Sequence, residues 1–157
     1  MERNDNPSGS KVTPSLLFWR LSLGVAGVLE CSIALYHAVL PYHMEWARGL
    51  GGVPDSLVWA IFALNFSWSV VVFLSGCLII YAAFLGPAAG RFAKRTVFVM
   101  GLFWLIHGLY TWQNPLPLPP SLVWLRALLG AFPVIVVALH WLPLAAYRQH
   151  SPEGDSY

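Results

Sequence analysis

Two ionisable residues, Glu30 and His37, lie seven positions apart inside a long apolar stretch that runs from residue 18 to residue 46. Residues at this spacing lie on nearly the same face of an α-helix, so both side chains are expected to point the same way. An ionisable side chain in a membrane-spanning helix is costly unless it packs inward, and it is a functional candidate for that reason. Glu30 and His37 are therefore the first candidates for binding a cation, a quinone or a small polar solute, or for relaying protons.

Other apolar stretches of the chain also carry polar residues. Counted along each expected helix from its outward end, His107 and Arg126 lie near that end and Asn65 lies deeper. We predict that five residues from four helices line one outward-facing polar cavity and form a ligand or proton site: Glu30, His37, Asn65, His107 and Arg126. By the same count, His140 is expected alone, toward the cytoplasm.

Two other interpretations of these polar residues stay open. In the first, they hold the bundle together: Glu30 pairs with Arg126 or a protonated histidine, and Asn65 forms hydrogen bonds between helices. In the second, which has less support, His37 and His107 are axial ligands of a haem or bind a metal ion. No metal ligand set or cofactor can be named from the sequence.

Catalytic motifs of soluble enzymes do not occur in the chain. It has no phosphate-binding loop, no GxSxG, no HExxH and no Rossmann glycine pattern, so an enzyme is the less favoured class and no catalytic residue is assigned. Cys31 and Cys77 are isolated in apolar segments, which favours buried small hydrophobic side chains over a thiol or zinc site.

The composition indicates a protein of the lipid bilayer. Of the 157 residues, 57% are hydrophobic and only 10% are charged, whereas a soluble domain has about 25% charged residues. The net charge of +2 and the absence of a basic cluster interleaved with aromatics give no reason to expect a nucleic-acid partner.

The apolar pattern predicts an all-α fold, a polytopic membrane protein made of a four-transmembrane-helix bundle with short loops. The four spans are expected at about 16–40, 57–85, 96–112 and 122–147, within a transmembrane domain at 15–147. The polar tails, 1–14 and 148–157, are expected to be disordered. Pro41 is expected near the end of the first span, and Pro133 is expected to kink the fourth.

The positive residues indicate how the bundle is oriented. Seven fall on the side of the tails and only two, Arg48 and Arg126, on the other. Positive residues favour the cytoplasm, so both termini are expected there, in the cell (inner) membrane. The first apolar stretch is too long for a signal peptide and is expected to be retained. The seven residues are Arg3, Lys11, Arg20, Arg91, Lys94, Arg95 and Arg148.

Small residues are predicted to mark the faces at which helices meet. On the first span these are Gly24, Gly27, Cys31, Ala34 and Ala38, and on the second an inward stripe of Asn65, Ser69, Val72 and Gly76. Such faces could also contact a membrane-protein partner or a second copy of the chain. In shape alone, four short-looped spans with an inward acid resemble the small bacterial membrane proteins of the DoxX type, and that resemblance implies no function.

The function expected from these residues is that of a small membrane protein with an outward-facing polar cavity, which binds a small ligand or moves a solute or a proton. The alternative is a non-catalytic structural or assembly subunit of a membrane complex.

Overall fold

The computed structural model describes residues 14–86, 91–114 and 123–150, and these residues are almost entirely helical. Four helices are long and apolar enough to cross a membrane, which confirms the predicted all-α four-helix membrane fold. They are α1 (Pro14–His43), α3 (Asp55–Leu85), α4 (Arg91–Gln113) and α5 (Val123–His150), and a single short turn of helix, α2 (Trp46–Gly49), follows α1.

The ends of the helices differ from the ends of the apolar stretches. α4 begins at Arg91, five residues before the predicted start at 96, because Arg and Lys are good helix formers even where they leave the apolar region. α1 continues through Pro41 to His43 instead of ending near Leu40. The predicted tails lie almost wholly outside the described residues.

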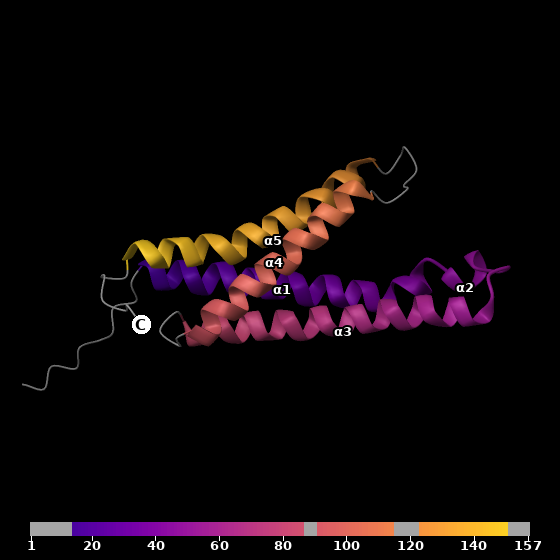
Figure 1. The fold of residues 1–157 in the computed structure, drawn as a ribbon, viewed down its shortest axis with the longest axis horizontal. Helices are drawn as coiled ribbons and strands as arrows, with labels where there is room; N and C mark the ends of the chain where they lie inside the picture. Colours follow the sequence, from indigo (N-terminus) through magenta and orange to yellow (C-terminus); the bar gives the residue numbers. More distant parts are fainter. Residues whose placement is uncertain (1–13, 87–90, 115–122, 151–157) are drawn as a thin grey trace, which may run out of the picture.

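The four long helices form two antiparallel hairpins, α1 with α3 and α4 with α5 (Figure 1). Close to the ends at which α1 begins and α5 finishes, α5 lies along α1 and the hairpins are packed together. Toward the other end, which carries α2, the α4–α5 hairpin leans away from the α1–α3 hairpin (Figure 1). The contact between the hairpins is therefore concentrated in one half of the molecule.

Within the first hairpin, α1 and α3 approach most closely at two glycines. A β-carbon at Gly27 would lie 2.6 Å from the carbonyl oxygen of Gly76, and one at Gly76 would lie 2.7 Å from the carbonyl oxygen of Gly27. Ser69, Val72 and Gly76 are all buried on α3, in agreement with the predicted stripe. Gly24 does not take part, because a β-carbon there would meet nothing within 4 Å.

Four tryptophans tie helices together through their indole N–H groups. Trp19 on α1 donates to the carbonyl of Ala82 on α3 at 3.1 Å. Trp112 on α4 donates to the carbonyl of Gly130 on α5 at 3.0 Å, three residues before Pro133. In hydrocarbon no water can satisfy a buried N–H, so each such bond costs more to lose than it would in water. The other two are Trp141, which donates to the carbonyl of Phe98, and Trp104, which is described below.

Candidate functional site

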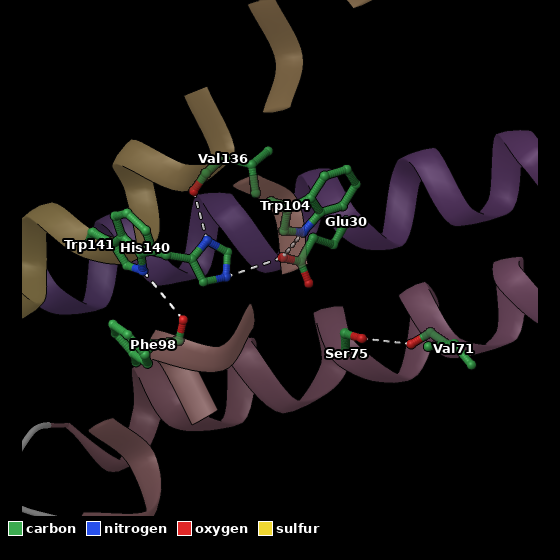
Figure 2. Close-up of polar contacts among 8 residues, drawn as sticks. All are labelled: Glu30, Val71, Ser75, Phe98, Trp104, Val136, His140 and Trp141. Carbon is green, nitrogen blue, oxygen red and sulfur yellow. Dashed lines mark hydrogen bonds and ion pairs between the residues drawn. The ribbon is translucent and has the colours of Figure 1, made fainter. Parts of the chain in front are cut away.

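The carboxyl group of Glu30 lies at the junction of three helices (Figure 2). Its Oε1 accepts a hydrogen bond of 2.7 Å from the indole N–H of Trp104 on α4. The same oxygen lies 3.2 Å from Nε2 of His140 on α5. The Glu30 and His140 side chains are 0% exposed, and Trp104 is 1% exposed. One carboxyl oxygen of α1 therefore contacts both helices of the second hairpin.

The sequence of α4 explains why Trp104 reaches this position. Gly101 and Gly108 lie three residues before and four residues after it, on the same helical face. Both are sites of close approach to α5, because a β-carbon at Gly101 would collide with the Trp141 ring and one at Gly108 would lie 2.9 Å from Pro133. The two glycines allow the helices to come together with the indole between them.

His140 is oriented by its own helix. Its Nδ1 lies 2.7 Å from the backbone carbonyl of Val136, one turn earlier in α5 (Figure 2). A carbonyl oxygen only accepts, so Nδ1 must carry a hydrogen and donate it. This bond turns Nε2, the other ring nitrogen, toward Glu30.

The site lies between two apolar clusters of buried side chains. One contains Trp19, Leu23 and Ile79, and the other contains Val72, Trp104 and Val136. Along α1, Glu30 falls between Ala26 of the first cluster and Ala34 of the second. The carboxyl and imidazole groups are thus held in an apolar environment, where electrostatic interactions are stronger than in water.

Two buried polar atoms of this site lack a hydrogen-bond partner among the described residues, Oε2 of Glu30 and Nε2 of His140. Nε2 is close enough to Oε1 for an ion pair, but the contact lacks the alignment of a hydrogen bond. We therefore treat it as a close electrostatic contact. Leaving a buried polar atom without a partner costs about 1–3 kcal/mol.

The position of His140 is the main difference from the sequence-based expectation, which left this residue alone on the cytoplasmic side. Depth was counted in residues from the outer end of each span, as if all helices were parallel to one another. α5 leans away from α1 toward its first residue (Figure 1), and an inclined helix needs more residues to reach the same depth. The count therefore placed His140 too far from Glu30.

His37 and His107 lie near each other but do not contact the Glu30 carboxyl. Both imidazoles pack against the indole of Trp68 on α3, with ring centroids 4.4 Å and 5.8 Å away. The ring of Trp104 meets His107 edge to face at 5.4 Å. His37 and His107 thus belong to an aromatic cluster that adjoins the Glu30 site through Trp104.

Asn65 makes a backbone contact. Its amide Nδ2 donates to the backbone carbonyl of His37 at 2.7 Å. Pro41 has no N–H to offer the carbonyl four residues earlier, which is that of His37. The Asn65 amide replaces the missing helical hydrogen bond, and this explains how α1 continues past Pro41.

Arg126 is exposed on α5, 14 residues before His140. That separation is about 21 Å along a helix that rises about 1.5 Å per residue. The described residues show no ion pair between Arg126 and a carboxylate. The structure therefore brings Glu30 together with Trp104 and His140, which the sequence analysis did not include, and places Arg126 away from them.

The described part of the chain holds no group of three or more His, Cys, Asp or Glu side chains that could bind a metal ion. Comparisons with protein families, curated proteins and solved structures found no significant match. What the fold and the site define is a small four-helix membrane protein with a buried Glu–Trp–His junction. Its function has to be inferred from the chemistry of that junction.

We predict that Asn65 and Pro41 are energetically coupled. Asn65→Ala should lower the free energy of unfolding by about 0.5–1.5 kcal/mol, because the carbonyl of His37 loses its partner. In a Pro41→Ala background the new amide of residue 41 can donate to that carbonyl, and Asn65→Ala should then have almost no effect. Thermal unfolding of the four proteins in detergent measures the coupling.

The matched control is Asn114→Ala, which removes an exposed amide that donates to the carbonyl of Tyr110 in the last turn of α4. Its small effect should be the same in the wild-type and Pro41→Ala backgrounds. Equal effects of Asn65→Ala in these two backgrounds would show that Asn65 does not compensate for the proline.

Proposed function

We propose that this membrane protein binds a small ligand or moves a solute or a proton at an intramembrane site centred on Glu30. The observation that carries the proposal is the state of its carboxyl group: it is fully buried, it faces an imidazole nitrogen, and its Oε2 has no hydrogen-bond partner among the described residues. Ionisable groups placed in this way inside a membrane bundle mark pathways for ions, protons or substrates.

A structural role alone gives no reason for an acid at this position. The indole of Trp104 needs only a neutral acceptor, which a glutamine would supply. A buried charged pair is often no more stable than apolar side chains of the same volume. Retaining an ionisable carboxyl opposite an imidazole is better explained by a function that uses its charge or its proton.

The position of the histidines supports access from the end of the molecule that carries α2. His107 adjoins Trp104, and His37 shares the indole of Trp68 with it. Because His37 lies between Glu30 and the end of α1 that leads to α2, polar groups continue from Glu30 toward that end. A solute or proton that approaches from there would meet these two imidazoles before it meets Glu30.

The alternative, a structural or assembly subunit, is favoured by one feature. Glu30 connects α1 to both α4 and α5, so its contacts hold the two hairpins together. In that case the chain should co-purify with a membrane-protein partner or as a homo-oligomer, and the charge of Glu30 should be dispensable.

We also propose that the protein lies in the plasma membrane with both termini in the cytoplasm. The division of positive residues, seven to two, supports this orientation. Arg91 and Ala47 are exposed at opposite ends of the bundle. In a Cys31→Ala, Cys77→Ala background, Ala47→Cys should react with an impermeant thiol reagent on intact cells and Arg91→Cys should not; the reverse pattern would invert the orientation.

The decisive variant for the proposed function is Glu30→Gln. We expect it to fold, because the amide fills the volume of the carboxyl group and its oxygen, in the position of Oε1, still accepts from Trp104. We expect it to lose activity, because the amide can neither ionise nor balance a positive ligand. The measurements are proton flux into liposomes under an imposed potential, and thermal shift with sodium ions, a short-chain quinone and a primary amine.

Glu45→Gln is the control, because Glu45 is an exposed carboxylate that pairs with Arg48 at the outer end of α1. It should retain the flux or thermal shift of the wild type. A Glu30→Gln protein that matches the Glu45→Gln protein in all four assays would favour the structural alternative.

A further inference from the structure

The geometry around His140 limits the number of protons that the site can hold. Nδ1 donates its hydrogen to the carbonyl of Val136 at 2.7 Å, so it is protonated in every state that keeps this contact. Any further proton of the pair must therefore lie on Nε2 of His140 or on the carboxyl group of Glu30. Three occupancies have to be compared: no proton, one and two.

With no further proton, a carboxylate oxygen faces the lone pair of Nε2 at 3.2 Å, and the pair carries a net negative charge in an apolar environment. With two, a protonated carboxyl group faces an imidazolium, and the pair carries a net positive charge. Either charge is buried without compensation, which is expensive inside a membrane. Only one proton leaves the pair neutral overall and makes the 3.2 Å approach attractive.

Trp104 cannot share in the proton exchange. Its indole is only a donor, and it occupies one lone pair of Oε1 at 2.7 Å. The indole therefore orients the carboxyl group, with Oε1 directed at His140 and Oε2 left free. Trp104 is a positioning residue for this pair.

The neighbouring groups do not offer an alternative partner for the proton. On α1 the adjacent Cys31 directs its thiol at the carbonyl of Phe73 on α3, 3.7 Å away. The Ser75 hydroxyl on α3 donates to the carbonyl of Val71 in its own helix (Figure 2). The remaining titratable groups near the pair are Cys77 on α3, beside Cys31, and His107 on α4, against Trp104. In the described part of the four long helices, no second carboxylate faces Glu30.

The groups around the Glu30–His140 pair also argue against a metal cation as the species that is bound. Hard cations such as Ca²⁺ and Mg²⁺ require several oxygen ligands. Here Oε1 is already in contact with Trp104 and His140, and the described residues hold no group of three or more His, Cys, Asp or Glu side chains that could surround such an ion. Oε2 is the one carboxylate oxygen of Glu30 without a partner among them.

We infer that Glu30 and His140 together hold a single proton, on the carboxyl group or on Nε2, and that the species this site takes up and releases is a proton. This inference rests on the proposed function and names its substrate. Uptake or release of one proton forms or breaks one O–H or N–H bond and changes the net charge of the pair by one unit.

The inference predicts how stability depends on pH. When the pH falls far enough to add a second proton, the pair becomes positive and the folded state loses stability. When the pH rises far enough to remove the single proton, the pair becomes negative and stability falls again. The melting temperature of the wild type in detergent should therefore be constant over an intermediate range of pH. It should decrease at lower pH, which we call the acid fall, and at higher pH, which we call the alkaline fall.

Two variants should each remove one of these falls. Glu30→Gln leaves His140 as the one ionisable group of the pair, and a neutral imidazole creates no buried charge at high pH, so the alkaline fall should disappear while protonation of the imidazole still produces an acid fall. His140→Leu leaves a neutral carboxyl group bonded to Trp104, so the acid fall should disappear and the alkaline fall remain. Glu45→Gln, the exposed control, should retain both.

A melting temperature of the wild type that is flat across the pH range would overturn the inference without any variant. So would a Glu30→Gln protein that follows Glu45→Gln on the alkaline side, or a His140→Leu protein that follows it on the acid side. If one variant does not fold, the other still decides, because each tests a different fall.

The outcome can be separated from that of the proposed function. If the two falls behave as stated but liposomes show no Glu30-dependent flux and no ligand shifts the melting temperature, the pair holds one proton and the functional proposal fails. If activity depends on Glu30 but neither fall changes, the site acts on a species other than a proton.

Discussion

The absence of water from the hydrocarbon region is the constraint on which this structure depends, because every polar atom there must find its partner inside the bundle. The chain meets this requirement with side chains that reach across helices. Trp19 donates to a backbone carbonyl of α3, and Asn65 donates to the carbonyl of α1 that Pro41 leaves without a partner. Trp104 donates to the carboxyl group of Glu30. These contacts connect helices whose remaining surfaces are apolar and could slide past one another. Among the buried side-chain nitrogen and oxygen atoms of the described residues, those left without a hydrogen-bond partner are Oε2 of Glu30 and Nε2 of His140.

This pair also lies where the two hairpins are joined. α1 and α3 are held along their length by close packing at Gly27 and Gly76. The second hairpin meets them chiefly in one half of the molecule (Figure 1), and Glu30 of α1 contacts both α4 and α5 (Figure 2). A change in the charge of the pair therefore acts on the contact between hairpins. If the pair binds a proton as proposed, proton binding and the relative position of the hairpins would be linked through these three side chains.

Much of the fold could be predicted from the sequence, because lipid selects for long apolar helices and the apolar stretches are unambiguous. Glu30 could be identified for the same reason, since an acid in such a stretch is expensive. The partners of Glu30 could not. His140 was missed because depth counted in residues ignores the inclination of α5, and Trp104 was one of eight tryptophans with no spacing to single it out except its two flanking glycines. Asn65 was recognised as inward, but its role depends on a proline in another helix, and Arg126 was included on depth alone although it is exposed.

The central claim is that the Glu30 carboxyl group lies between the Trp104 indole and the His140 imidazole. Solid-state NMR of the protein in lipid, with ¹³C in glutamate and ¹⁵N in histidine and tryptophan, tests it most directly. The account predicts dipolar contacts from the Glu30 carboxyl carbon to one imidazole nitrogen and one indole nitrogen, with the histidine signal lost in His140→Leu, and it predicts that Nδ1 of His140 is protonated. A Glu30 carboxyl carbon with no contact to either ring, or a His140 with an unprotonated Nδ1, would contradict it.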